Sequence, residues 1–451
     1  MIVTRFWRGY RPKGRARGPF KDRPLLESEN AKDGAAGKFA LVSIRLPVAL
    51  TFAALIAGLV AGIAGAALDV PQWAQDVASL IGGLWLRALQ MTIIPLVAAL
   101  LVLGLIQMIL AARVGTVARR MLLIMVGVQL AGGAFASVAM PALLETFPVP
   151  TGASAFLAQT PDTVGEVPGV LDFAASLVSP NIIAAAAETA MLPLTLFFVM
   201  FAVAITRLPA DQGDRLLWFF HALGNVMLLI IGWVLAIAPI GVFALAFGVG
   251  VQSGGGAFAA LGHYVLTVTA MGTFVLILAY VIAVMLGRSG VRFATAVLPA
   301  QAVALSTQSS LASLPAMLDS AGRLGLKAST AEFVLPLAVV IFRATSAAMN
   351  LAVVYYIAAL AGIEIPFAIA VAGVLIAAVI SLSAVSLPGS ISFVVSIGPI
   401  ALAMGVPVEP LALLVAVEML PDLMRTLGNV TMNVAVTSAV DRSSRTASAS
   451  S

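Results

Sequence analysis

The residues best suited to chemistry lie in the last long apolar stretch of the chain, about residues 410–438. Placed on an α-helix, its polar side chains fall within one arc of about 100°, so they share a face. A guanidinium on that face can hold a carboxylate through two parallel bonds, which predicts an anion site. The alternative is an internal Asp422–Arg425 or Glu418–Arg425 ion pair that stabilises a helix bundle. The polar positions are Glu418, Asp422, Arg425, Thr426, Asn429 and Asn433.

Composition defines the surroundings of this face. The chain has 451 residues, of which 61% are hydrophobic and only 10% charged, whereas soluble proteins carry about 25% charged residues. Lipid must therefore be the solvent for much of the chain, and the polar face must contact protein or water. Cysteine is absent and the histidines are His221 and His263. Without a nucleophile–base pair or a metal-ligand cluster, we expect neither an enzyme nor a resident cofactor or metal.

Basic residues are concentrated at the start of the chain. Residues 1–45 are polar and basic and precede the first apolar run, so no cleavable signal peptide is evident. We interpret this tail as a cytoplasmic topology signal, with some attraction to anionic lipid. It lacks the aromatic pattern typical of RNA binding, so no nucleic-acid partner is expected.

Apolar runs long enough to cross a bilayer, which takes about 20 residues, alternate with shorter ones. Two regions, 293–318 and 366–405, each hold two short apolar arms around a polar tip rich in Ser, Gly or Pro. Such a pattern predicts re-entrant hairpins, with a substrate site between their tips. We therefore predict an all-α polytopic membrane protein with eight transmembrane helices and two re-entrant helical hairpins. The expected spans lie at 46–68, 78–112, 121–144, 175–206, 217–248, 262–287, 331–361 and 410–438.

Charged residues in the expected loops give the orientation. With the basic tail inside, the inner loops hold arginine and lysine, whereas the outer segments hold acidic residues and no arginine or lysine, as the positive-inside rule requires. We expect both termini in the cytoplasm and the protein in the cell inner membrane.

Four stretches in chain order carry a resemblance to a known family. They are LRALQMTIIPLV at 86–97, APIGVFAL at 238–245, SSLASLP at 309–315 and RTLGNVT at 425–431. They resemble the second span, the end of the fifth, the first hairpin tip and the eighth span of the dicarboxylate/amino-acid:cation symporter family, which has the glutamate-transporter fold. Leu311 replaces the third serine of that tip. The chain is identified as a divergent member.

The resemblance implies a homotrimer that moves its substrate by an elevator-type mechanism. Residues 46–250 would form the scaffold and trimer contacts, with the third span joining the transport domain of residues 251–440. Residues 1–45 and 441–451 would be cytoplasmic tails.

By the same resemblance, Arg425 binds a side-chain carboxylate of the substrate and Asp422 its ammonium group. Thr426 and Asn429 add hydrogen bonds, and the hairpin tips hold the other carboxylate. The implied substrate-binding set is Ser309, Ser310, Ser386, Pro388, Gly389, Asp422, Arg425, Thr426 and Asn429.

The chain departs from the family where cations bind. The family's Asn-Met-Asp-Gly-Thr in the seventh span aligns with Phe342-Arg343-Ala344-Thr345-Ser346, and the family's cation-binding aspartate of the eighth span is Asn433. A Thr-Ser pair of the third span is Gly132-Gly133. Glu418 and Asp422 then face Arg343 and Arg425. Because such a site has no excess negative charge, it attracts sodium less strongly. We assign Arg343 as a built-in cation; the alternatives are snorkelling to an interface or pairing with Glu332. The coupling positions are Arg343, Ala344, Ser346, Glu418 and Asn433.

These features predict a secondary carrier for a small anionic substrate, an acidic amino acid, that can work without sodium by proton coupling or exchange. The choice between sodium and a proton as coupling ion stays open. A C4-dicarboxylate carrier is the close alternative, favoured by Asn433 and opposed by Asp422, which would repel a second carboxylate. The alternative from another functional class is a membrane sensor that has the same fold but does not transport.

Overall fold

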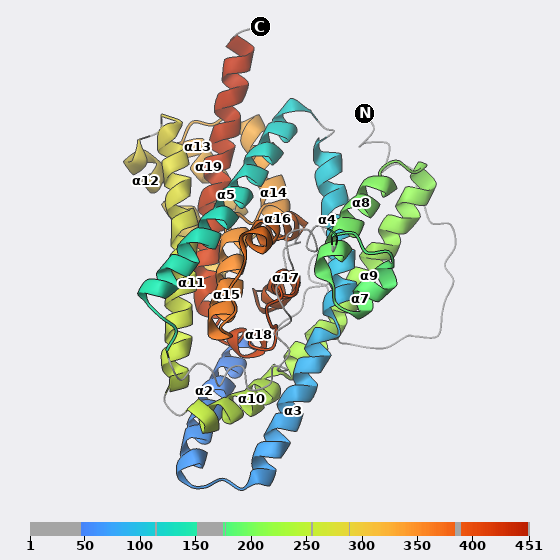
Figure 1. Cartoon of the computed structure of the whole chain (residues 1–451). Coiled ribbons are helices and arrows are strands. Elements are labelled where there is room, and N and C mark those ends of the chain that lie inside the picture. Colours follow the sequence, from blue (N-terminus) through green and yellow to red (C-terminus); the bar gives the residue numbers. More distant parts are fainter. Residues whose placement is uncertain are drawn as a thin grey trace, which may run out of the picture. The chain divides into compact units, whose positions relative to one another are not determined.

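The computed structural model describes residues 47–112, 115–150, 175, 177–253, 256–287, 289–383 and 389–449. The chain divides into residues 1–42 and 43–451. All described residues belong to the second unit, so the expected basic tail at 1–45 lies outside them. Within these ranges the regular elements are α-helices (Figure 1).

The first half of the membrane region contains long apolar helices, several joined end to end. Leu89 and Thr92 mark one junction, where the Thr92 hydroxyl donates to the Leu89 carbonyl between α3 and α4. The helices are α2 Val48–Ala67, α3 Gln72–Gln90, α4 Ile93–Ala112, α5 Thr116–Thr146, α7 Ile182–Ala187, α8 Met191–Ile205, α9 Ala210–Ala236, α10 Ala238–Ser253 and α11 Gly256–Met285.

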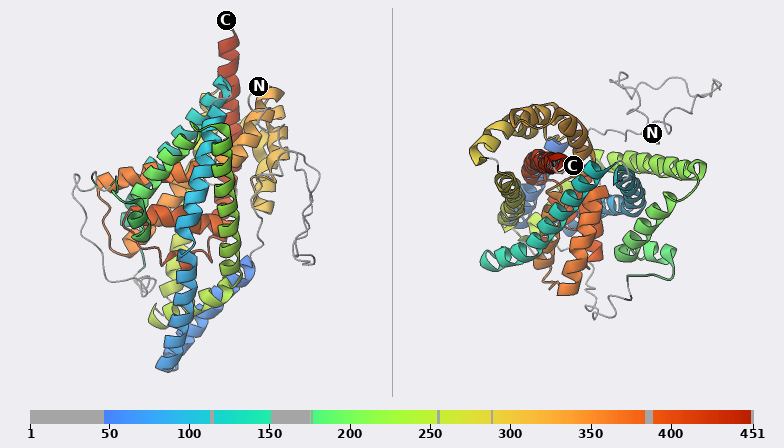
Figure 2. Two further views of the ribbon diagram at one scale, coloured as in Figure 1. Left: turned by 90° about the vertical axis from the view of Figure 1, so that its right-hand side faces the viewer. Right: turned by 90° about the horizontal axis from the view of Figure 1, so that it is seen from above.

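The second half is built from shorter and broken helices. They are α12 Gly290–Thr307, α13 Leu314–Arg323, α14 Ala328–Ile341, α15 Ser346–Leu360, α16 Phe367–Ser383, α17 Gly389–Ala403, α18 Leu411–Leu414 and α19 Met419–Ala449. The last helix thus continues through the segment after residue 440 for which the sequence predicted a tail. Helix α19 packs against α11, α12, α13 and α14, and its end lies beside the arc of α12–α14 in the view from above (Figure 2).

Two packed pairs of short helices occupy the regions where hairpins were expected. Helix α12 packs against α13, and α16 packs against α17; each helix has 18 residues or fewer. The chain leaves α12 at Gln308, whose left-handed backbone (φ 51°) ends the helix, because few residues other than glycine adopt that conformation inside one. Ser309 and Ser313 then close the turn, since the Ser313 hydroxyl donates to the Ser309 carbonyl at 2.9 Å.

Six segments of the described chain are long and apolar enough to cross a membrane. They are Ala49–Ala67, Gln72–Leu110, Thr116–Thr146, Ala210–Ala236, Gly256–Met285 and Ala328–Leu360. The other two expected spans differ: 175–206 contains the shorter helix α8, and 410–438 contains α18 and the polar-striped α19. The count of eight spans remains a prediction.

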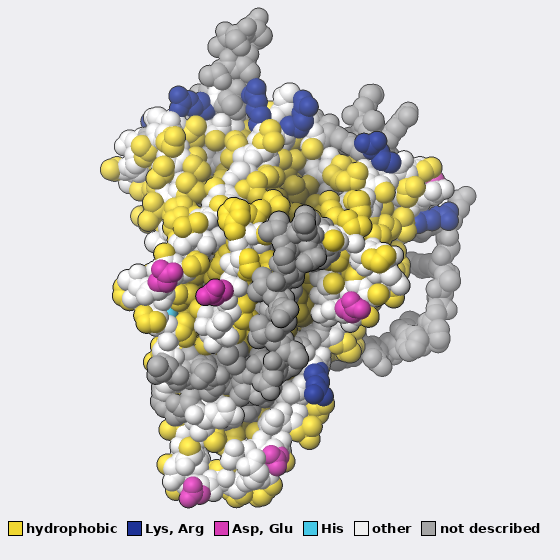
Figure 3. Space-filling model, viewed as in Figure 1, with side chains coloured by type: hydrophobic (Ala, Val, Ile, Leu, Met, Phe, Trp, Pro, Cys, Tyr) yellow, Lys and Arg dark blue, Asp and Glu magenta, His cyan; other side chains and the backbone are white. Residues whose placement is uncertain are grey.

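Charged side chains follow the expected polarity on the face drawn in Figure 3. Most basic side chains gather toward the end where α19 emerges, and the acidic ones lie mainly in the opposite half, with apolar surface between them. The orientation in the membrane that the loop charges predict stays a prediction.

Close approach between neighbouring segments depends on glycine at two places. A Cβ on Gly62 of α2 would lie 2.2 Å from the Phe247 carbonyl oxygen of α10, and one on Gly428 of α19 would lie 2.5 Å from Cγ2 of Thr345. Neither distance is possible for a real side chain, so small residues let these backbones meet, as is common between membrane helices.

Candidate functional site

The site residues predicted on the last helix lie where the break between α14 and α15 meets the start of α19. Residues 342–345 leave the helical path, and Phe342 has extended backbone. Asn429 on α19 holds this break: its Oδ1 accepts from the Thr345 backbone N–H at 2.9 Å and from the Thr345 hydroxyl at 3.0 Å. From the other side, Gln129 of α5 donates to the Arg343 carbonyl at 2.7 Å and accepts from the Ala347 N–H at 3.3 Å. Side chains therefore satisfy the backbone groups that the broken helix exposes.

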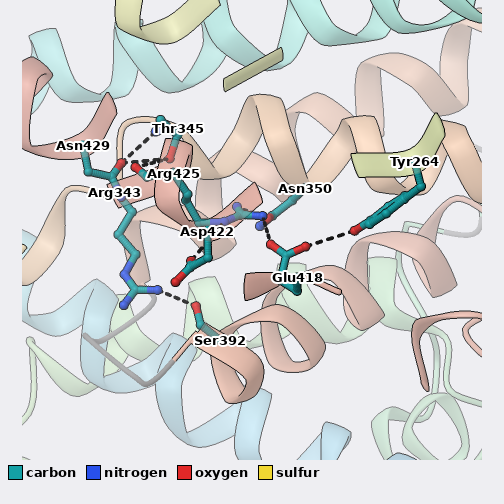
Figure 4. A network of polar contacts seen from close by, with 9 residues as sticks. All are labelled: Tyr264, Arg343, Thr345, Asn350, Ser392, Glu418, Asp422, Arg425 and Asn429. Carbon is teal, nitrogen blue, oxygen red and sulfur yellow. Dashed lines mark hydrogen bonds and ion pairs between the residues drawn. The ribbon is translucent and has the colours of Figure 1, made fainter. Parts of the chain in front are cut away.

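Arg425 and Glu418 form a buried ion pair. Arg425 Nη2 donates to Glu418 Oε1 at 2.8 Å, with the two side chains 8% and 2% exposed. Arg425 Nη1 donates to Asn350 Oδ1 at 2.8 Å, and the Tyr264 hydroxyl donates to Glu418 Oε2 at 3.0 Å. Figure 4 shows these groups in one row. The pair has neutral partners on both sides, which is the arrangement that a buried ion pair requires.

Asp422 lies on the outer side of this pair. Its Oδ1 is 3.7 Å from Arg425 Nε, and its side chain is 15% exposed. Arg343 and Asp422 also attract each other electrostatically. Asp422 is thus the more accessible of the two acids in the site.

Arg343 turns toward the second pair of short helices. Its Nη1 donates to the Ser392 hydroxyl on α17, and Figure 4 shows its guanidinium beside Asp422 and Ser392. The side chain is half-buried, whereas Glu332 is exposed on α14. Arg343 therefore belongs to the polar cluster, an arrangement different from snorkelling to an interface.

The other predicted residues fall into three groups. Ala344, Ser346, Thr426 and Asn433 are buried. Neither amide atom of Asn433 has a hydrogen-bond partner among the described residues. Ser309 and Ser310 lie half-buried in the α12–α13 turn. Gly389 begins α17, whereas Ser386 and Pro388 lie outside the described residues.

Sequence reasoning missed five polar residues of this cluster: Gln129, Tyr264, Thr345, Asn350 and Ser392. Gln129, Tyr264 and Asn350 are polar side chains within long apolar runs, and Tyr264 and Asn350 are at most 1% exposed. A single polar residue within an apolar run could have identified them, because burying a polar group costs free energy unless it has a hydrogen-bond partner. The described residues contain no group of three or more His, Cys, Asp or Glu arranged to hold a metal.

A broken helix, two pairs of short packed helices and a buried charged cluster define a polytopic membrane protein of the transporter class. The chain matches the model of the sodium:dicarboxylate symporter family over residues 48–443. It belongs to that family, as its motifs predict.

Similar proteins differ in the substrates that their names give. A proton/sodium-glutamate symport protein of Bacillus subtilis is 28% identical over 63% of this chain and 67% of its own length. The proton/glutamate-aspartate symporter of Escherichia coli is 26% identical over 56% of this chain and 60% of its own length. C4-dicarboxylate transport protein 2 of Pseudomonas aeruginosa is 33% identical, but over only 38% of this chain and 39% of its own length.

Proposed function

We propose that this protein is a secondary carrier that moves acidic amino acids such as aspartate and glutamate across the inner membrane. The observation that carries the proposal is the position of Asp422. It lies at the accessible edge of a cluster that holds two arginines. A carboxylate there attracts a substrate ammonium group, and the arginines attract carboxylates. The names of the glutamate symporters that the chain resembles support the same class.

Competition between ligands for binding tests this proposal directly. Purified protein in liposomes should bind L-aspartate or L-glutamate better than succinate or fumarate, which lack the ammonium group. Succinate as the best ligand would favour the second candidate, a C4-dicarboxylate carrier. That candidate is supported by Asn433, which carries no charge, and by the names of other relatives. Ligand binding without uptake would instead favour a transport-silent sensor.

The domain arrangement is also a proposal, with residues 46–250 as scaffold and 251–440 as the moving domain of a homotrimer. Helix α5 packs against α15, α16 and α19, which supports its place in the moving part. Helix α10 packs against α2 and α3, and α4 packs against α8 and α9, which supports a separate scaffold. Both termini would face the cytoplasm.

Sodium independence follows from the charges and contacts at the break. Glu418 and Asp422 face Arg343 and Arg425, which leaves no excess negative charge for a cation to neutralise. Asn429 Oδ1 already accepts hydrogen bonds from the backbone N–H and the hydroxyl of Thr345. The Gln129 amide donates a hydrogen bond to the carbonyl oxygen of Arg343. Oxygens engaged in this way are less available as cation ligands. Coupling to protons or substrate exchange would then replace sodium.

A further inference from the structure

A cavity of about 430 Å³ lies between the end of α11, the start of α12 and the later part of α19. The candidate span Gly256–Met285 ends one residue before Leu286, which begins the lining of this cavity. At about 1.5 Å per residue, the 30 residues of α11 match the thickness of a bilayer with its headgroups, so α11 ends at headgroup depth. We propose that this cavity binds the phosphate group of an anionic lipid.

Two exposed arginines line the cavity. Arg292 lies in the first turn of α12 and Arg442 on α19. Within the described part of the chain, no hydrogen bond or ion pair engages the Arg292 guanidinium, so a phosphate that binds there displaces no existing contact. Arg442 Nη1 donates to the Met285 carbonyl at 3.5 Å, which holds its guanidinium over the end of α11. A guanidinium presents a planar fork that matches the geometry of a phosphate group.

Ser438 adds a buried hydroxyl to the lining. The residue is 1% exposed, and its Oγ has no hydrogen-bond partner among the described residues. A buried polar group without a partner costs free energy, so a phosphate oxygen that accepts from this hydroxyl would be stabilising. The start of α12 contributes as well, because the Ser289 side chain does not cap this helix. Its first backbone N–H groups thus remain to attract an anion.

Asp441 is the acidic residue of the lining, and the fold already uses it. Its Oδ1 accepts from the backbone N–H of Lys327, which directly precedes α14, at 3.2 Å, and the residue is 1% exposed. Two arginines against one carboxylate leave the lining with a positive net charge. The cavity therefore favours an anion over a cation.

Exposed apolar side chains next to the cavity favour a lipid over free phosphate. Met285 on α11 is 78% exposed and Val291 on α12 is 75% exposed, and each directly precedes a residue of the lining. A lipid can place its headgroup in the cavity and its acyl chains along this apolar surface. Basic pockets between membrane helices are typical binding sites for anionic headgroups. Free phosphate would gain nothing from the apolar surface.

The test titrates purified protein in detergent with phosphatidylglycerol and measures lipid binding by native mass spectrometry. Arg292→Gln should weaken binding about fivefold or more, and Ser438→Ala about twofold or more. The matched control is Arg323→Gln, because Arg323 is an exposed arginine of α13 that pairs with Asp319. This control loses the same charge outside the cavity and should change binding less than about twofold.

Three results would overturn the proposal. Unchanged phosphatidylglycerol binding in Arg292→Gln would show that the lipid binds elsewhere. Equal losses in Arg292→Gln and Arg323→Gln, with none in Ser438→Ala, would mean that surface charge alone attracts the lipid. Inorganic phosphate at millimolar concentration separates the two sources of a phosphate group, and we expect most of the lipid to stay bound in its presence. Complete displacement by inorganic phosphate would identify a site for the free ion instead.

Discussion

The guanidinium of Arg425 on α19 lies 2.8 Å from the carboxylate of Glu418 in the interior of the protein. Glu418 immediately precedes the first residue of α19. Both side chains are less than 10% exposed. An ion pair of Arg425 with Glu418 or with Asp422 was the alternative to a substrate site that the sequence left open. The structure contains the pair and also brings Asp422 and Arg343 beside it, so a stabilising pair and a substrate site can coexist on one helix face.

Loss of one partner of this pair should destabilise the protein more than loss of both. Arg425→Gln leaves Glu418 as an unpaired buried charge, at a cost of about 3–5 kcal/mol. Adding Glu418→Gln removes that charge and should recover a large part of the loss. Thermal unfolding of the two single variants and the double variant in detergent provides the comparison. Additive losses would show that the pair contributes no coupling energy.

Asp422 should decide between amino acids and dicarboxylates. Replacing Asp422 with Ser removes the proposed partner of the ammonium group and relieves the repulsion of a second carboxylate. The preference for L-aspartate over succinate should therefore narrow or reverse, as measured by competition against labelled aspartate. Asp319, an exposed acid on α13 that pairs with Arg323, is the matched control, and Asp319→Ser should leave the preference unchanged. A preference that survives Asp422→Ser would remove this residue from the site.

Gly428 should be essential for the contact between α19 and the break. Gly428→Ala places a methyl group where Cγ2 of Thr345 lies 2.5 Å away, so Thr345 must move from Asn429 and stability should fall by about 1–3 kcal/mol. Thr345→Ser in the same chain removes the clashing methyl, keeps the hydroxyl and should rescue stability. Gly262→Ala on α11 meets nothing within 4 Å and should be tolerated. Failure of the rescue would mean that another contact limits this position.

Much of the fold could be predicted because membrane chains carry strong signals. The bilayer requires long apolar runs, so most helices followed from hydropathy alone. The short arms at 293–318 and 366–405, which predict re-entrant hairpins, contain the packed pairs α12–α13 and α16–α17. The ends of the helices were harder to predict than their presence. Helix α19 continues to Ala449, because the Ser- and Ala-containing segment after Asp441 has no proline or glycine that would end a helix.

The site could be predicted only along one helix. The 3.6-residue period placed Glu418, Asp422, Arg425 and Asn429 on one face. The partners from other helices, such as Tyr264 of α11 and Gln129 of α5, depend on tertiary packing that no local pattern encodes. The role of Thr345 was hidden for the same reason, since its contact with Asn429 spans 84 positions in the chain.

Transport should not require sodium. The charge balance of the site and the occupied oxygen of Asn429 leave a cation few ligands, so uptake with sodium replaced by choline, at fixed pH and membrane potential, should stay within about tenfold of the sodium value. Restoring aspartate at Ala344 alone should not create sodium dependence, because Arg343 would pair with the new carboxylate. A larger loss in choline, equivalent to more than about 1.4 kcal/mol of coupling, would show that sodium binds despite these contacts.

Counterflow tests the central claim most directly, because it needs no knowledge of the driving ion. Liposomes containing the purified protein are loaded with unlabelled L-aspartate and diluted into labelled L-aspartate, with protein-free liposomes and succinate-loaded liposomes run beside them. We predict a transient accumulation of label that the aspartate-loaded vesicles show strongly, the succinate-loaded ones weakly and the protein-free ones not at all. Accumulation that is as strong or stronger with succinate inside, or none with aspartate or glutamate, would contradict a carrier for acidic amino acids.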